Sequence, residues 1–150
     1  MDESTRQLLI ASDHATACEA PPGFNWKESM RRVRVLVPRL EQLVGQSLST
    51  DENVQDASFF TDVACYREAS HPGIGKVLVP IIAIRFSAFG NLFTVTKADD
   101  FDDDAFTSAR EMTSKAGYLY VPADQLDEPY TGANPHLANT TWWTRFFDYL

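Results

Sequence analysis

Apolar residues recur at every third or fourth position between Trp26 and Val44, and this spacing is typical of an amphipathic helix. Asn25 can accept a hydrogen bond from the first free amides of such a helix, and Gly45 can end it. Pro38 has no amide hydrogen to donate. We therefore expect a helix that is kinked or broken near Pro38.

From residue 54 onward the pattern changes to runs of apolar and β-branched residues, which favour strands. Three runs, at 54–68, 77–88 and 92–96, are separated by short connections and indicate an antiparallel meander. The middle run is almost wholly apolar, so we expect it at the centre of the sheet. Pro80 within it predicts a bulge or an unpaired stretch.

The remaining third of the chain is predicted to contain helices, a short strand and an irregular connection. Apolar spacing predicts a helix over 102–116, whose start an aspartate can cap, and then a short strand over 118–121. Prolines, glycine and asparagines make 122–141 a long irregular connection, and such connections often carry function. Residues 142–150 hold five of the 18 aromatic side chains and predict a terminal helix that closes the core.

Together these elements predict a single α+β domain over residues 1–150 with a central, mainly antiparallel sheet. The meander at about 54–96 and the short strand form that sheet, and helices near 26–44, 102–116 and 142–150 pack against it. Residues 3–19 show loose helical spacing before Pro21-Pro22-Gly23. They predict a first helix, and the alternative is a frayed, less ordered segment over residues 1–24.

Composition narrows the function classes. The 150 residues carry 13 basic and 21 acidic side chains, a net charge of −8, which disfavours a nonspecific nucleic-acid binder. No apolar stretch approaches the roughly 18 residues of a membrane span. Met1-Asp2-Glu3 is acidic where a secretory signal would be positive. We expect a cytoplasmic protein that binds neither nucleic acid nor membrane.

The cysteines and histidines give no catalytic or metal-binding spacing. Cys18 and Cys65 are expected to be free thiols, and His14, His71 and His136 form none of the known zinc motifs. Cys65 could meet His71 or His136 only in space, and its apolar strand favours a buried thiol over a nucleophile. We therefore predict no catalytic residue, no metal and no cofactor. A small hydrolase or transferase with a pocket in the 122–141 loop, using His136 or His71, is the alternative.

Charge is distributed unevenly along the chain. Between Trp26 and Leu40 five basic residues stand against one acid, Glu28, whereas residues 99–104 hold five carboxylates within six positions. A solvent-exposed helix N-terminus accounts for the acids at 102–104, because the helix dipole favours negative charge there. It accounts less well for a cluster of five carboxylates. A basic partner is the other interpretation, because an acidic surface attracts and orients one. The candidate binding residues are Asp99, Asp100, Asp102, Asp103 and Asp104, followed by Asp124, Asp127, Glu128 and Tyr130 in the long loop.

Three segments, Val54–Phe60, Pro129–Gly132 and Trp142–Leu150, resemble parts of small bacterial immunity proteins of contact-dependent growth inhibition systems. The resemblance implies a cytoplasmic, non-enzymatic protein that binds and neutralises one cognate toxin domain, in many cases a nuclease. It transfers no binding residue, and the three segments are expected to be scaffold. The resulting hypothesis is an immunity protein that occludes the active site of a basic toxin domain. An oligomeric adaptor that associates through its aromatic C-terminus is a further alternative, and the sequence predicts no oligomeric state.

Overall fold

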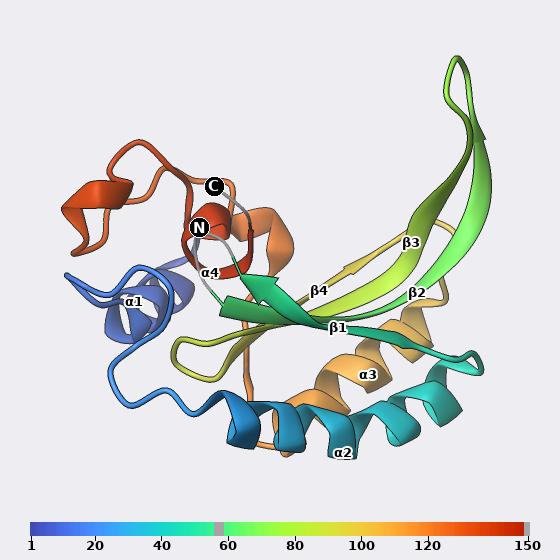
Figure 1. Ribbon diagram of the computed structural model, residues 1–150, viewed down its shortest axis with the longest axis horizontal. Helices are drawn as coiled ribbons and strands as arrows, with labels where there is room; N and C mark the ends of the chain where they lie inside the picture. Colours follow the sequence, from blue (N-terminus) through green and yellow to red (C-terminus); the bar gives the residue numbers. More distant parts are fainter. Residues whose placement is uncertain (56–58, 149–150) are drawn as a thin grey trace.

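A computed structural model describes residues 1–55 and 59–148 and places a five-stranded sheet at the centre of an α+β fold (Figure 1). Helices α2 and α3 cover one face of the sheet, and α4 lies over the other face with α1 beside it (Figure 1). The helices are α1 (Glu3–Ser12), α2 (Trp26–Val44), α3 (Asp103–Lys115) and α4 (Trp142–Phe147), with 3₁₀ turns η1 (Ala123–Gln125) and η2 (Pro135–Leu137). The strands are β1 (Ser49–Gln55), β2 (Phe59–His71), β3 (Gly75–Ser87), β4 (Leu92–Lys97) and β5 (Leu119–Tyr120). The predicted fold class is confirmed.

The strands follow one another across the sheet in chain order, and the first four are antiparallel. β5 is parallel to β4 because α3 carries the chain back between them. The predicted first strand proves to be two strands, since Gln55 of β1 pairs with Phe59 of β2 across a chain reversal. Residues 56–58, which the prediction placed within that strand, lie outside the described residues. Their sequence contains no glycine or proline that would have divided the predicted run.

The expected irregularity at Pro80 is present as a β-bulge in β3. Cys65 pairs with Ile82 and Tyr66 pairs with Pro80, so Ile81 is an extra residue without a partner in β2. The Ile81 carbonyl instead accepts a hydrogen bond of 2.8 Å from the amide of Ala98. A bulge bends the strand and increases its local twist, and here it precedes the part of β3 that leaves the sheet.

Helix α2 begins and ends where its sequence predicts. The side chain of Asn25 accepts a 3.1 Å hydrogen bond from the amide of Glu28, and Gly45 ends the helix at φ +73°. The predicted break at Pro38 is absent, because the helix continues from Trp26 to Val44. Pro38 is exposed, so water can bond the carbonyl that its missing amide leaves free.

The core has two parts, one on each face of the sheet. Between the sheet and helices α2 and α3, Val33 and Leu40 pack among side chains such as Ile84 and Phe93. On the other face the aromatic residues of α4, with Leu9 of α1, are buried. The expectation that the aromatic C-terminus closes the core is confirmed for residues 142–147, while Tyr149 and Leu150 lie outside the described residues. No helix in the described part of the chain is both long and apolar enough to cross a membrane.

A buried ion pair joins α4 to the N-terminal segment. Arg145 is 0% exposed, and its Nε donates a 2.7 Å hydrogen bond to Oδ1 of Asp13. Its two terminal nitrogens donate to the carbonyls of Cys18 and Ala17 at 2.9 and 3.0 Å, and the guanidinium lies 4.0 Å from the ring centre of Phe89. Asp13 also caps the end of α1, so this helix ends at Ser12 and does not extend to residue 19. These contacts order the segment that the sequence left ambiguous.

Candidate functional site

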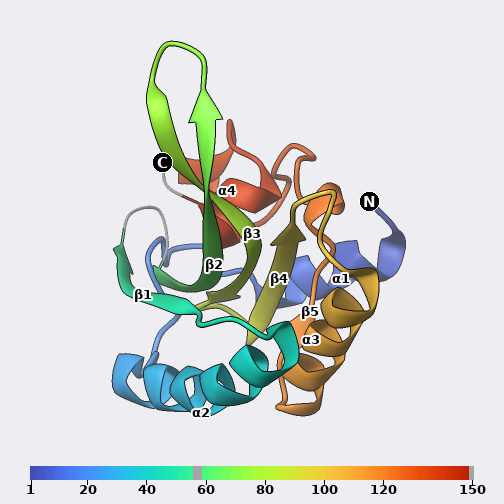
Figure 2. The ribbon, with the colours of Figure 1, turned by 90° about the vertical axis from the view of Figure 1, so that its right-hand side faces the viewer.

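The β2–β3 hairpin extends beyond the rest of the sheet. β1 pairs with β2 only as far as Ala64, and β4 pairs with β3 only from Ile82 onward. Beyond the bulge the two strands pair only with each other, over the six residue pairs between Tyr66↔Pro80 and His71↔Gly75. We call residues 66–80 the hairpin arm. At about 3.3 Å per residue it is about 20 Å long, and it rises away from α2 and α3 in two perpendicular views (Figures 1 and 2).

The tip of the arm is built by its glycines. Gly73 and Gly75 adopt φ of +86° and +92°, a region that other residues rarely enter, and so they allow the tight reversal. Ile74 stands between them, and its amide donates to the carbonyl of His71 at 3.2 Å. The short connection expected between the runs at 54–68 and 77–88 is therefore a tight turn at 72–74.

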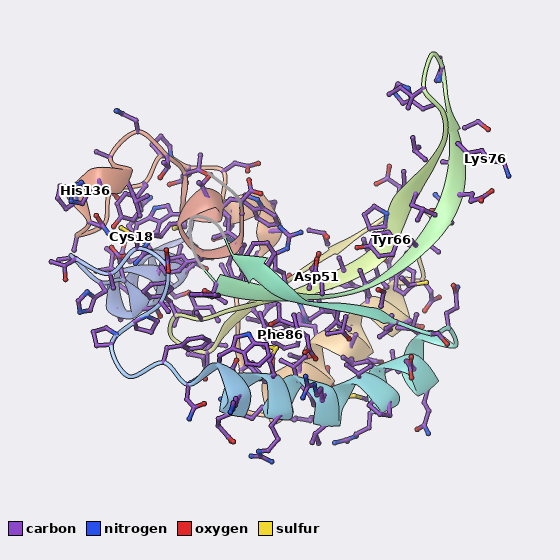
Figure 3. The ribbon with its side chains drawn as sticks, in the orientation of Figure 1. Cys18, Asp51, Tyr66, Lys76, Phe86 and His136 are labelled. Carbon is purple, nitrogen blue, oxygen red and sulfur yellow. The ribbon has the colours of Figure 1, made fainter. Side chains whose placement is uncertain are left out.

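Large apolar side chains are exposed along the arm. The exposed fractions are 43% for Tyr66, 71% for Ile74 and 68% for Leu78. Figure 3 shows Tyr66 and Lys76 on the arm, at the opposite end of the molecule from His136 and Cys18. A hydrophobic residue standing alone on a surface needs no explanation, but three on one projecting element form a candidate contact surface.

The arm is fixed at its base to residues 99–104, which we call the acidic loop. Arg67 of the arm forms an ion pair with Asp100. The hydrogen bond from Arg67 holds the pKa of Asp100 below its ordinary value, so this carboxylate stays ionised at neutral pH. The pair places the arm and the acidic loop side by side.

The acidic loop is exposed, but most of its acids also have a role within the chain. Asp102 is the aspartate that caps α3, and it accepts a 2.7 Å hydrogen bond from the amide of Ala105. Asp103 and Asp104 lie in the first turn of α3, where the helix dipole favours negative charge, and Asp103 pairs with Lys97 at 3.1 Å. These local contacts explain most of the cluster, so the acidic loop alone does not require a partner.

Asp102 therefore has a structural role that can be separated from binding. We expect Asp102→Ala to lower the free energy of unfolding by about 0.5–2 kcal/mol, because the first turn of α3 loses its cap. The exposed neighbour Asp99 is the matched control, and Asp99→Ala should leave stability almost unchanged. Urea unfolding of both variants measures the difference. Equal stabilities would show that Asp102 does not cap the helix.

The candidate residues of the 122–141 connection lie elsewhere. Figure 1 shows the acidic loop at the base of the arm, whereas residues 123–128 lie near α4. Asp124 and Asp127 are exposed. Glu128 binds the N-terminal amine and Arg6, and these two partners hold the pKa of its carboxyl below the ordinary value. The structure thus does not join the two sets of predicted site residues into one surface.

Tyr130 is 4% exposed, so it is a buried residue of the core. Its hydroxyl donates to Oδ2 of Asp13 and accepts a 2.8 Å hydrogen bond from the amide of Asn134. Burial by itself would raise the pKa of Asp13, but hydrogen bonds from Tyr130, Arg145 and the Ala133 amide outweigh it and lower the pKa. Tyr130 and Glu128 are therefore left out of the candidate surface.

Burial and the hydrogen bond to Asp13 raise the pKa of Tyr130 to about 12. A tyrosine in the unfolded chain ionises near ~10, so the neutral phenol contributes stability that is complete below that pH and is lost as the pH rises toward about 12. We expect the free energy of unfolding to fall over this range and Tyr130→Phe to reduce the fall. Thermal unfolding in alkaline buffers measures it. The same pH dependence in both proteins would contradict this assignment.

The predicted state of the cysteines is confirmed, and the histidines are dispersed. Cys18 and Cys65 are free, and the buried Cys65 thiol donates to Oε1 of Gln46 at 3.0 Å. His71 is six residues from Cys65 along β2, about 20 Å away, so these two cannot form a catalytic pair. His136 lies exposed in η2. Within residues 1–55 and 59–148 no three His, Cys, Asp or Glu side chains gather closely enough to hold a metal ion.

The hairpin arm was not among the elements predicted from the sequence. Two features of the sequence point to it in retrospect. The two β-type runs on either side of 70–75 are longer than the run at 92–96, and Ile74 stands between two glycines. Long strands beside short ones must extend beyond the sheet.

Comparison with known proteins identifies no relative of this chain. No family model, curated protein or solved structure matches it significantly.

Proposed function

We propose that the protein is a cytoplasmic immunity protein that binds a basic toxin domain through the hairpin arm and the acidic loop and neutralises it by occluding its active site. The location of the surface comes from the geometry of the arm. The sign of the partner's charge comes from the acidic loop and the net charge of −8. The toxin as partner comes from the resemblance to immunity proteins of contact-dependent growth inhibition systems.

The hairpin arm is the observation that carries this proposal. A two-stranded hairpin alone is marginally stable in water, and the arm has no third strand along its six pairs in the described chain. Its apolar side chains at Ile74 and Leu78 remain largely in water. Burying an aliphatic side chain of this size contributes roughly 1.5–3 kcal/mol. A partner that covers the arm supplies this burial.

The acidic loop supports the choice of a basic partner. Asp103 and Asp104 are exposed beside the arm, and Lys97 pairs with only one of them. Charges at the rim of an interface mainly speed association and select a partner of opposite sign, while buried apolar contacts hold the complex together. The acidic loop and the arm therefore have complementary roles.

The segments that resemble immunity proteins fit the scaffold role expected of them. Tyr130 lies in the core, as do Trp142, Phe146 and Phe147 of α4. Of the first segment, residues 56–58 are outside the described chain, and Phe60 is buried. The proposed binding surface is separate from these segments, so binding residues can differ while the scaffold persists.

The test uses the reading frame directly upstream of the gene, because immunity and toxin genes are expected to be neighbours. Its C-terminal domain is expressed in bacteria with and without this protein, and growth is measured. The proposal predicts that the domain is basic, that it stops growth alone, and that co-expression restores growth. Growth arrest that this protein does not relieve, or an upstream product without toxicity, would refute the proposed function.

A further inference from the structure

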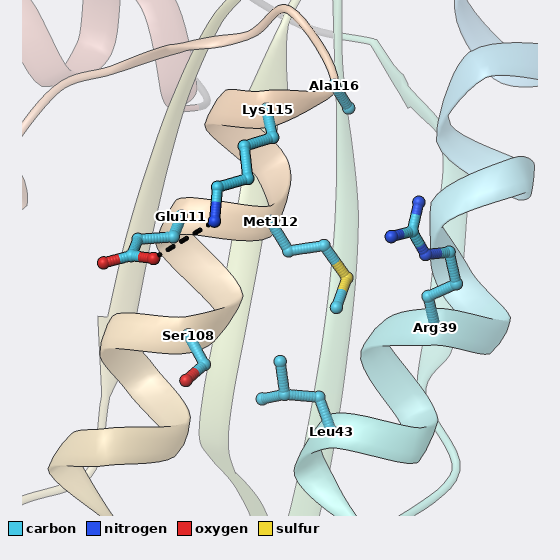
Figure 4. A pocket seen from close by; sticks show the side chains of 7 residues that line it. All are labelled: Arg39, Leu43, Ser108, Glu111, Met112, Lys115 and Ala116. Atoms are coloured by element: carbon cyan, nitrogen blue, oxygen red, sulfur yellow. Dashed lines mark hydrogen bonds and ion pairs between the residues drawn. The ribbon is translucent and has the colours of Figure 1, made fainter.

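A groove runs between α2 and α3 on the side of these helices that faces away from the sheet (Figure 4). Its main hollow, of about 320 Å³, is lined by Arg39 and Leu43 of α2 and by Met112 and Lys115 of α3, among others. A second hollow of about 200 Å³ also touches Arg39 and continues along α2. Because the two hollows share lining residues, they form one groove, which we call the helix groove.

Basic side chains border the helix groove although the protein is acidic. Arg39, an exposed residue, makes no hydrogen bond or ion pair with any described residue. Arg32 is held over the ring of Tyr118 at 4.5 Å, and it donates a 2.8 Å hydrogen bond to Asn91. Lys115 pairs with Glu111 at 3.4 Å but stays largely exposed. Glu111 also lines the main hollow, so the groove is bordered by more cations than carboxylates, and Arg39 is the cation available for a ligand within the described residues.

The groove also has apolar walls. Leu43 and Met112 are partly buried against the core between the helices and the sheet, and their side chains point into the hollow (Figure 4). Val35, which lines the second hollow, is 60% exposed. An apolar floor bordered by cations is complementary to a ligand that carries both apolar groups and carboxylates.

The spread of the cations indicates the kind of ligand. Arg32 and Arg39 are seven residues apart on α2, about 10 Å at the rise of an α-helix, and Lys115 stands across the groove on α3. A small anion needs donors that converge on one point, whereas these cations are distributed along the groove. The partly buried apolar side chains of Leu43 and Met112 suit a ligand with apolar groups better than the phosphate backbone of a nucleic acid.

We propose that the helix groove binds an acidic amphipathic segment of a partner protein. Carboxylates of the segment pair with Arg39 and Lys115, and its apolar side chains pack on Leu43 and Met112. Arginine suits this role because its planar group can hold a carboxylate through two hydrogen bonds. The helix groove and the hairpin arm are different surfaces, so this proposal does not depend on the proposed function.

The probe is a fluorescein-labelled synthetic peptide in which leucines recur at helical spacing between glutamates, and its binding is measured by fluorescence anisotropy. We expect the peptide to bind more weakly as salt rises, and Arg39→Glu to weaken binding about tenfold or more. Lys27→Glu is the matched control, since it makes the same charge change on exposed α2 surface outside the lining of the groove. It should change the affinity less than about twofold.

Four results of these binding measurements would overturn the proposal. The first two are that the glutamate peptide does not bind, or that a peptide with glutamine in place of glutamate binds equally well. The other two are that Arg39→Glu and Lys27→Glu lose equal amounts of affinity, or that a single-stranded oligonucleotide binds more tightly than the glutamate peptide. Self-association that Arg39→Glu abolishes would also overturn it, because a second copy of the chain would then occupy the groove. Thermal unfolding of both variants verifies that each is folded.

Discussion

Replacement of Arg145 by methionine is expected to lower the free energy of unfolding by about 3–5 kcal/mol, the usual effect of removing one partner of a buried ion pair. The substitution leaves the carboxylate of Asp13 buried without its cation. It also removes the donors that satisfy the carbonyls of Ala17 and Cys18. Since α1 and residues 13–18 are held to α4 by these contacts, their loss should release the N-terminal segment. Urea unfolding followed by circular dichroism measures the change.

The control is a solvent-exposed ion pair on the surface of the protein. Arg31 and Glu28 on α2 form a salt bridge of 2.6 Å, but both side chains are exposed. Arg31→Met should therefore change stability little, because solvent screens the pair. The double variant Arg145→Met with Asp13→Leu should recover part of the loss, since no charge then remains buried. A stability of Arg145→Met within about 1 kcal/mol of the wild type would contradict the structural role given to Arg145.

Replacing Ile74 and Leu78 together by serine is expected to weaken the complex with the upstream-encoded toxin domain about 100-fold or more, because each loses apolar burial of roughly 1.5–3 kcal/mol. The same substitutions should change the free energy of unfolding by less than about 0.5 kcal/mol per site, since both side chains are already in water. Ile10→Ser on α1 is the control, because Ile10 is also half exposed but lies outside the arm. Isothermal titration calorimetry measures the affinities. An equal loss of affinity for Ile10→Ser would show that exposed apolar area in general, and not the arm, determines binding.

The parts of the fold that could be predicted are those with strong local signals. Asn25 and Gly45 mark both ends of α2, and Asp102 marks the start of α3, because caps act within a few residues along the chain. Pro80 predicts an irregularity for the same reason, since a proline cannot donate to a strand partner. The reversal between β1 and β2 had no such marker.

The candidate site depends on contacts that no local pattern contains. Tyr130 lies in the irregular 122–141 connection, which predicts a surface position, but its hydroxyl donates to Asp13, 117 positions away in sequence. Glu128 likewise meets the N-terminal amine. The arm depends on where the neighbouring strands stop, which follows from the tertiary pairing of β1 and β4 and not from the sequence of the arm itself. Residue type thus identified the acidic loop, whereas only the topology revealed the arm.

Hydrogen–deuterium exchange of the protein, alone and with the upstream-encoded toxin domain, tests the central proposal most directly. The arm has few contacts in the free protein, so its amides should exchange early. In the complex we expect strong protection of residues 66–80 and of the acidic loop, with little change in η2. Protection confined to other surfaces, with the arm exchanging as fast in the complex as in the free protein, would contradict the proposal that the hairpin arm binds the partner.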